Sequence, residues 1–295
     1  MADEAAYARI YTEHDLSATI KSGQTFAFTD TGGGFAGAAD GRPAEIRVND
    51  GGYIIIARED DAGFWRRYFD LEASYDDLLQ PFIGAAETNA IPETGRSFLE
   101  LCAGTFKGLR LLRQPVWETI CAFIISANNN IGRIGSIYMN ISRRYGDAFM
   151  WNGREYHTFP PAATLAAAGE GDLRGLGLGY RAAYIQKTAE TIAIGGLPDL
   201  DALEYEEAFR YLTGLRGVGE KVAECALLFS TRHRRAFPVD VWVERILREY
   251  FGMGGSRRVL RREAEKLFGE AGGIIQQYMF HGIRSGLKLN EAGDN

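Results

Sequence analysis

Hydrophobic residues follow two different periods along this chain, and the change between them separates a strand-rich start from a helical remainder. Over residues 6–60, apolar side chains recur at every second position, and the clearest pairs are Phe26 and Phe28, Ile46 and Val48, and Tyr53 and Ile55. Runs rich in glycine, asparagine and aspartate separate these pairs. Alternation at period two, broken by turn-forming residues, is typical of antiparallel strands. We therefore predict a β-meander in this part of the chain.

From about Asp61 onward, apolar residues recur at intervals of three and four, which predicts helices. One such stripe consists of Trp117, Ile120, Cys121, Ile124 and Ile125. Further helical periods cover residues 131–144, 182–193, 202–213, 220–230, 240–250, 256–268 and 273–285. The predicted fold class is therefore α+β, with an N-terminal antiparallel β-sheet lobe over residues 1–105 and a mostly helical body over residues 106–295.

Composition places the chain among ordinary globular proteins. With 295 residues, 46% of them hydrophobic and 24% charged, it can bury the core of one large or two moderate domains. The first residues lack a basic segment, and no apolar run approaches the roughly 18 residues that a membrane span needs. We expect an intracellular protein of the cytoplasm or nucleoid, monomeric and without a membrane partner. Three widely spaced cysteines, Cys102, Cys121 and Cys225, predict neither a disulfide framework nor a metal site.

A glycine-flanked turn before the helical run at 220–230 carries the strongest chemical signal. Gly217, Val218 and Gly219 let the backbone turn tightly and point free N–H groups outward at the start of that helix, which predicts a phosphate-binding turn. Lys221 follows in the first helical turn, and Asp240 returns after a short basic loop. An amine nucleophile with a carboxylate near it, beside a phosphate-binding turn, indicates covalent chemistry on a nucleic acid.

The distribution of charge agrees with a nucleic-acid partner, although the net charge of −6 does not. Residues 1–100 contain 8 Lys or Arg and 18 Asp or Glu, a balance of −10, whereas residues 208–268 contain 13 and 7, a balance of +6. Phosphate binding depends on the local charge of the binding face. A basic C-terminal region on an acidic chain is therefore compatible with DNA.

The segment 207–241 resembles the helix-hairpin-helix and the following Pro-Val-Asp segment of base-excision DNA glycosylases, with the motif itself at about 207–230. Its lysine is typical of their bifunctional members, and matches along nearly the whole chain narrow the resemblance to the 8-oxoguanine DNA glycosylases. The resemblance implies a glycosylase and AP lyase that excises 8-oxoguanine, preferably opposite cytosine, from duplex DNA. Lys221 would form the Schiff base and Asp240 would be the catalytic carboxylate. The partner would be double-stranded DNA containing a damaged purine, and no cofactor or metal is needed.

Two polar stretches resemble the family's contacts to the opposite strand. An Asn-Asn-Asn-Ile-x-Arg run assigns Asn128 and Arg133 to the orphaned cytosine, and a Gly-rich turn makes Tyr180 a wedge in the base stack and Arg181 a second cytosine contact. Taken without the resemblance, the first stretch is an Asn-rich helix end and the second is an ordinary turn between helices.

Four further residues resemble the pocket that holds the damaged base. Gln276 and Phe280 lie four residues apart and so on one helical face, and Cys225 lies four residues after Lys221. In the family, similar residues hold the flipped base, and a glycine at the position of Gly23 presents its backbone carbonyl to it. Plain packing would also explain the cysteine and the phenylalanine.

The chain departs from the eukaryotic members at two positions. Trp242 stands where they carry a histidine, and Ile283 stands where an aspartate is expected. We interpret the joint change as a repacked wall on the phosphate side that leaves Lys221 and Asp240 in place.

Two other functions stay open on the sequence alone. A non-catalytic helix-hairpin-helix DNA-binding protein would keep the glycines, and its lysine would only contact phosphate. A glycosylase for another damaged base would keep the lysine and the aspartate as well.

Overall fold

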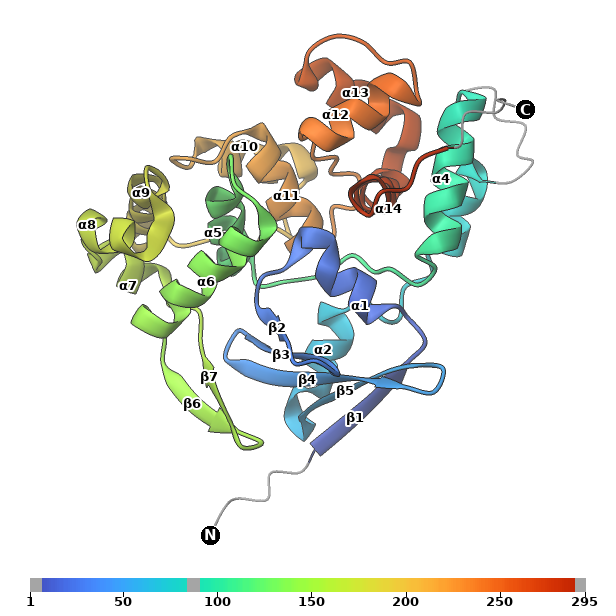
Figure 1. Ribbon diagram of the computed structural model, residues 1–295. Helices are drawn as coiled ribbons and strands as arrows, with labels where there is room; N and C mark the ends of the chain where they lie inside the picture. The colour runs from blue at the N-terminus through green and yellow to red at the C-terminus, as the bar shows by residue number, and fades with distance from the viewer. Residues whose placement is uncertain (1–6, 84–90, 290–295) are drawn as a thin grey trace.

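A five-stranded antiparallel sheet forms the N-terminal part of the computed structural model, which describes residues 7–83 and 91–289 (Figure 1). The strand order is β1-β5-β4-β3-β2. The bounds of the strands are β1 (Tyr7–Thr12), β2 (Phe28–Asp30), β3 (Gly34–Ala39), β4 (Arg42–Asn49) and β5 (Gly52–Arg58). Ile55 of β5 pairs with Ile10 on one side and Ile46 on the other, so the alternating apolar residues meet on one face. The predicted α+β class with an N-terminal antiparallel sheet is confirmed.

Helix α2 (Ala62–Tyr68) covers the apolar face of this sheet. Its Trp65 and Tyr68, together with Phe69, are at most 1% exposed and pack on the buried isoleucines. Large aromatic side chains bury much apolar area per residue, so this short helix closes the core of the lobe.

The predicted meander is interrupted between β1 and β2 by helix α1 (Leu16–Thr19) and the helical turn η1 (Ile20–Gln24), which the pattern did not predict. Asp15 caps α1 by accepting a hydrogen bond from the Ala18 N–H at 2.8 Å. Gln24 then ties the turn to a distant segment, since it donates to the Arg110 carbonyl at 2.7 Å and accepts from the Leu112 N–H at 2.9 Å. This long-range anchor holds η1 in place, and it leaves no trace in local periodicity.

The helical body begins after the sheet and its helices match the predicted periods closely. Its longer helices are α4 (Glu93–Thr105), α5 (Val116–Ser126), α6 (Ile131–Tyr145), α9 (Arg181–Gly195), α10 (Tyr205–Gly214), α11 (Glu220–Ser230), α12 (Val241–Glu249), α13 (Arg257–Phe268) and α14 (Gly272–Arg284). The short helical pieces are η2 (Glu59–Asp61), α3 (Asp76–Leu79), η3 (Gln80–Phe82), α7 (Ala162–Ala167), α8 (Glu170–Leu173), η4 (Arg174–Leu178) and η5 (Gly269–Ala271). Within the described ranges, no helix combines the length and apolarity needed to cross a bilayer.

A β-hairpin inside the helical body was not predicted. Strands β6 (Ala148–Trp151) and β7 (Arg154–His157) are joined by Asn152 and Gly153, which have φ values of 48° and 72°. Two central residues with positive φ make the turn whose twist suits a two-residue hairpin, and Asn-Gly is its usual sequence. The Asn-Gly turn was visible in the sequence, but the flanking strands are too short to show the two-residue alternation of hydrophobic positions.

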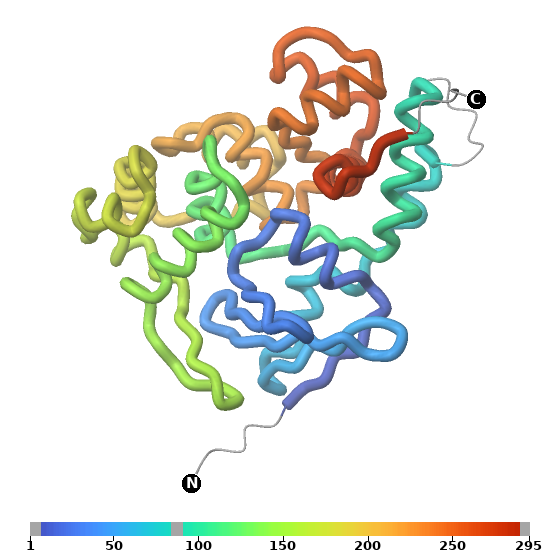
Figure 2. The backbone as a smooth tube through the Cα atoms, viewed as in Figure 1, coloured from blue at the N-terminus to red at the C-terminus, as the bar shows by residue number. Residues whose placement is uncertain are grey.

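The two cores meet at the last helix. The segment η1 runs beside α14, and α4 packs along the same helix (Figure 2). Buried residues of α4, such as Phe98 and Leu99, belong to the core of the helical body. We keep the division into residues 1–105 and 106–295 as a proposal, in which α4 is the element that both parts share.

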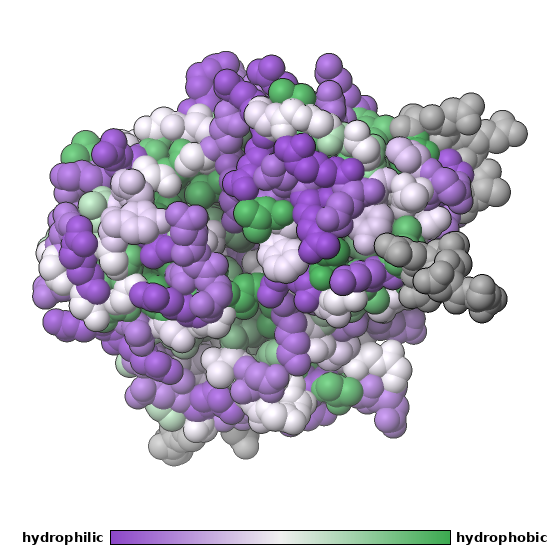
Figure 3. Space-filling view, turned by 45° about the horizontal axis from the view of Figure 1, so that its top comes forward, coloured by the Kyte–Doolittle hydropathy of each residue, from purple (hydrophilic) through white to green (hydrophobic). Residues whose placement is uncertain are grey.

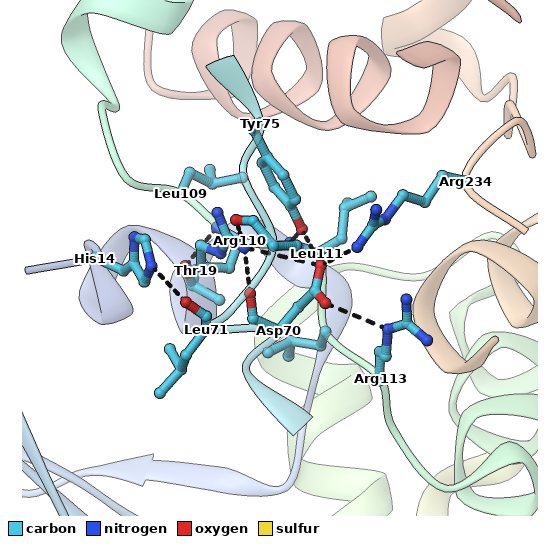
Figure 4. A network of polar contacts seen from close by, with 12 residues as sticks. His14, Thr19, Asp70, Leu71, Tyr75, Leu109, Arg110, Leu111, Arg113 and Arg234 are labelled. Carbon is cyan, nitrogen blue, oxygen red and sulfur yellow. Dashed lines mark hydrogen bonds and ion pairs between the residues drawn. The ribbon is translucent and has the colours of Figure 1, made fainter. Parts of the chain in front are cut away.

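A buried carboxylate joins the lobe to the body (Figure 4). Asp70 accepts a hydrogen bond from the Tyr75 hydroxyl at 2.8 Å and pairs with Arg113 at 3.4 Å and with Arg234 at 2.6 Å. Arg110, 3% exposed, lies 3.8 Å from the same carboxylate and also donates to the carbonyls of Asp70 and Ala73. One aspartate thus connects segments that lie far apart in the sequence.

We predict that Asp70→Asn lowers the free energy of unfolding by about 3 kcal/mol, because it leaves the arginines around it without a buried counter-charge. Asp70 has a φ of 48°, which asparagine tolerates well, so the substitution changes charge and not backbone conformation. Denaturant unfolding measures the effect.

The matched control is Glu190→Gln, which removes an exposed ion pair with Lys187 of 2.8 Å. An exposed pair of this kind contributes about 0.5 kcal/mol or less. Equal effects of the two substitutions would contradict a structural role for the Asp70 network.

Candidate active site

A cavity of about 320 Å³ lies where α5, the start of α6, α11, the start of α12, α14 and the turn η1 meet. The six residues assigned from the sequence to catalysis and to the damaged base all line it: Gly23, Lys221, Cys225, Asp240, Gln276 and Phe280. They come from four separate segments of the chain, so only the fold brings them together. In the space-filling view, apolar residues show between hydrophilic ones near the middle of the face (Figure 3).

The predicted glycine turn joins α10 to α11. Gly217 has a φ of 86°, and a Cβ on it would lie 2.4 Å from the Cβ of Tyr184, so no other residue fits without movement. Val218 is 4% exposed and anchors the turn in the core, while Gly219 is extended and forms the N-cap of α11. The turn therefore has the conformation expected of the hairpin, and its binding to phosphate stays a prediction.

Lys221 extends from the first turn of α11 into the cavity. Its Nζ donates to the Ser126 hydroxyl at 3.3 Å and lies 5.0 Å from the centre of the Phe123 ring. Both contacts come from the C-terminal half of α5. These contacts position the amine, and among the described residues it forms no ion pair.

Asp240 is the N-cap of α12. Its Oδ1 accepts hydrogen bonds from the N–H groups of Trp242 and Val243, each at 2.9 Å. A carboxylate at a helix N-terminus is stabilised by the free N–H groups and by the helix dipole. Within the described residues its Oδ2 accepts no hydrogen bond, so the helix fixes the carboxylate through Oδ1, and the residue lines the cavity.

A buried glutamate behind the cavity was missed by the sequence analysis. Glu224, with 0% exposure, accepts from the Tyr205 hydroxyl at 2.6 Å, from Arg261 at 3.0 Å and from the Phe237 N–H at 2.8 Å. Burial raises the pKa of Glu224, and these three partners oppose the rise. The glutamate joins the helix that carries Lys221 to the segment that leads to Asp240.

Cys225 and Gln276 give the cavity its chemical character. Burial raises the pKa of Cys225 to about 11, with Lys221 acting in the opposite direction, so the thiol is neutral at physiological pH. Gln276 is 4% exposed, and its buried Oε1 has no hydrogen-bond partner among the described residues. A buried amide oxygen without a donor is unfavourable, so this atom is available to a ligand that carries an N–H group.

Gly23 lies at the rim of the cavity with a φ of 81°. A Cβ added there would lie 2.7 Å from Cδ1 of Ile131. The neighbouring Ser22 carbonyl accepts a hydrogen bond from Gln277 at 3.2 Å, so α14 fixes the turn that presents Gly23.

The four residues assigned to the opposite strand do not line this cavity but gather around the loop between α5 and α6. Tyr180 is 45% exposed, and its hydroxyl lies 3.4 Å from Nδ2 of Asn128. Arg133 is exposed in the first turn of α6. Arg181 is only 6% exposed, and it donates to the carbonyls of Ala127 and Asn128. Arg181 thus stabilises the loop between α5 and α6. Its guanidinium can contact a base only if these hydrogen bonds to the loop carbonyls are broken.

Further residues line the cavity, among them Trp242, which the sequence placed in a repacked wall, and Arg284, to which the sequence gave no role. Trp242 is 40% exposed. Cys102 and Cys121 are buried and free, like Cys225. No group of His, Cys, Asp and Glu within residues 7–83 and 91–289 is arranged to hold a metal ion.

Comparison with known proteins identifies the family. The model for "HhH-GPD superfamily base excision DNA repair protein" matches residues 121–270, which contain the hairpin, Lys221 and Asp240. The chain belongs to this superfamily. The model for the N-terminal domain of 8-oxoguanine DNA glycosylase matches residues 8–120. The predicted family is thereby confirmed.

Relatives of this HhH-GPD protein agree with that assignment. The chain is 36% identical over 204 residues to a probable N-glycosylase/DNA lyase of Methanothermobacter thermautotrophicus, covering 61% of this chain and 65% of that one. It thus spans slightly less than two thirds of that relative. It is 32% identical over 294 residues to an N-glycosylase/DNA lyase of Arabidopsis thaliana, covering 92% and 77%. The Clostridium acetobutylicum 8-oxoguanine glycosylase/lyase, solved with DNA containing cytosine opposite 8-oxoguanine, is similar with a TM-score of 0.83, 29% identity and 93% coverage of each chain.

Proposed function

We propose that this chain is a bifunctional DNA glycosylase and AP lyase that excises 8-oxoguanine, preferably opposite cytosine, in base-excision repair. Its substrate is double-stranded DNA containing a damaged purine, and it needs no cofactor. The observation that carries the proposal is the shared cavity of Lys221 and Asp240 with the residues assigned to the base. Action as a monomer is part of this proposal.

The reaction starts with extrusion of the nucleotide from the stack, at a cost of roughly a few kcal/mol, so that C1′ reaches the cavity. The unprotonated amine of Lys221 attacks C1′, and the electron pair of the bond between C1′ and the base leaves with the base, which takes up a proton. The amine loses its proton and the sugar ring opens to an imine. Removal of a C2′ proton then expels the 3′ phosphate by β-elimination.

Asp240 stabilises the positive charge that develops on the sugar as the base leaves. Its position at the start of α12 suits this role, because two backbone N–H groups hold one oxygen in place and no reorientation is needed during the reaction. The neutral thiol of Cys225 and the ring of Phe280 provide apolar contacts for a flat base.

The other functions are separated by simple tests. A non-catalytic DNA-binding protein would give no covalent complex with damaged duplex on treatment with sodium borohydride. A glycosylase for another lesion would show its preference in a panel of damaged bases, each placed opposite all four bases.

Our first prediction here concerns the nucleophile. Lys221→Gln removes the amine, so base release and borohydride trapping both fall below detection. Binding of the damaged duplex stays near normal, because the hairpin turn is unchanged. Trapping gels and a binding titration measure the two effects, and Lys187→Gln, an exposed lysine on α9, is the matched control.

Asp240→Asn completes this experiment. Asparagine is an equally good N-cap, so the variant removes the charge and keeps α12 in place. We expect turnover to fall at least about a hundredfold. Wild-type turnover of either variant would rule out the mechanism.

A second prediction concerns the opposite base. Arg133 donates to acceptors that cytosine presents and adenine does not match in the same geometry. Arg133→Ala should therefore flatten the preference for cytosine more than it lowers the best rate, as measured by single-turnover rates opposite each of the four bases. Wild-type enzyme that works equally well opposite adenine would contradict the assignment.

A third prediction concerns how the lesion is distinguished from guanine. The lesion carries an N–H donor at N7 where guanine has a bare acceptor, so a fixed acceptor is the suitable reader, and the Gly23 carbonyl is our candidate. A 7-deaza analogue of 8-oxoguanine, which keeps O8 but lacks the N7 proton, should bind at least about fivefold more weakly than the true lesion. Equal binding of the two would place recognition at O8 instead.

A further inference from the structure

Arg284 has a cavity position that the proposed mechanism does not use. It lies in the last turn of α14, lines the cavity with Asp240 and Trp242, and places its guanidinium 5.4 Å from the centre of the Phe280 ring. Among the described residues, its side chain makes no hydrogen bond and no ion pair. An arginine carries five N–H donors in a planar fork, so this group is an unused anion binder.

Most arginines of the neighbouring helices α12 and α13 differ from Arg284, because they form ion pairs. Five of the six arginines of α12 and α13 have carboxylate partners within 3.2 Å, namely Arg245, Arg248, Arg257, Arg258 and Arg261, and the sixth, Arg262, is exposed. The partner glutamates all lie within residues 208–268 and are part of the balance of +6 for that region. Arg284 keeps its charge available at the cavity wall.

The electrostatic surroundings of Arg284 are set by Asp240. Burial lowers the pKa of Arg284, and the Asp240 carboxylate acts in the opposite direction. The guanidinium also approaches the turn at Gly23, since its Nη1 would lie 3.4 Å from a Cβ on that residue. Arg284 is therefore close to the Gly23 turn and within the electrostatic influence of the Asp240 carboxylate.

The backbone phosphates of an extruded nucleotide need a positive charge at this cavity, and Arg284 provides one. Lys221 must be unprotonated to attack C1′, and the Asp240 carboxylate lines the same cavity. The extruded nucleotide brings its own backbone phosphates, which are repelled by that aspartate. Of the residues that line the cavity, only Lys221 and Arg284 are lysine or arginine, so Arg284 is the cation that remains when the amine is neutral.

We propose that Arg284 binds a backbone phosphate of the nucleotide that enters the cavity, as a binding residue additional to the hairpin turn. The proposal rests on the proposed function, because it assumes that a nucleotide is extruded into this cavity. Arginine suits the role, since its fork can donate two parallel hydrogen bonds to phosphate oxygens.

The test compares Arg284→Gln, Arg284→Lys and the control Arg9→Gln with the wild type. Arg9 is exposed on β1, on the far side of the lobe from α14, and the control removes the same charge from the protein (Figure 1). Dissociation constants are measured for a duplex with a tetrahydrofuran abasic-site analogue and for the matching undamaged duplex. The salt concentration is varied between about 50 and 200 mM.

We expect Arg284→Gln to weaken binding of the analogue duplex at least about tenfold at low salt. The slope of log affinity against log salt should fall by about 0.9, the value for one lost phosphate contact. Binding of undamaged duplex should change less than about twofold, and Arg284→Lys should keep the wild-type slope because it keeps the charge.

Several results would overturn the inference. An unchanged salt slope in Arg284→Gln would show that Arg284 only packs against Phe280. An equal loss on both duplexes, or on Arg9→Gln, would show a general charge effect. Borohydride trapping of the wild type on damaged duplex is run in parallel. Loss of trapping would contradict the proposed function, whereas the binding data alone test the role of Arg284.

Discussion

The buried carboxylate of Glu224 is the interaction on which the geometry of the site depends, because it joins the two segments that carry the proposed catalytic residues Lys221 and Asp240. It lies on α11 after Lys221, and its bond of 2.8 Å to the Phe237 N–H fixes the chain just before Asp240. Arg261 of α13 neutralises it at 3.0 Å. Removal of Arg261 would leave the Glu224 carboxylate buried without a counter-charge, which costs about 3–5 kcal/mol. The amine and the carboxylate are therefore held relative to each other through short, rigid pieces of backbone.

The loop between α11 and α12 is held from two further sides. Arg234 pairs with Asp70 of the N-terminal lobe at 2.6 Å, and the Arg234 carbonyl accepts from the Gly273 N–H of α14 at 2.8 Å. A Cβ on Gly273 would lie 2.1 Å from Cδ1 of Leu228, so the close approach of α14 requires glycine. The lobe thus contributes to the position of Asp240 as well as carrying Gly23. The sheet lobe is therefore part of the structure that positions the candidate site.

Local spacing predicted the parts of the site that local geometry determines. Lys221 and Cys225, like Gln276 and Phe280, lie four residues apart on one helix, and a helix brings such pairs to one face wherever it packs. The conformation of Gly217 follows equally from its place before a helix. These relations need only the backbone of one element, so the sequence contains them.

Contacts between residues that lie far apart in the chain could not be predicted from local sequence patterns. The turn at Gly23 depends on Gln24 reaching Arg110, eighty-six residues later in the chain. The state of Arg181, bonded to the carbonyls of Ala127 and Asn128, depends on how α9 packs beside the end of α5. The same sequence would be compatible with an unbonded arginine at a DNA surface. The sequence therefore suggests a DNA contact for Arg181 but does not reveal the hydrogen bonds that must break before it can form.

The departure at Trp242 and Ile283 acquires a physical meaning in the structure. Ile283 is 7% exposed and belongs to the core of the helical body, whereas Trp242 lines the cavity and remains 40% exposed. One residue along a helix turns the side chain by about 100°. The chain therefore buries an apolar residue at 283 and directs a cation to the cavity wall at 284. The cavity wall therefore lacks the polar pair of the eukaryotic members. The charged residue at 284 still provides an electrostatic partner for the Asp240 carboxylate.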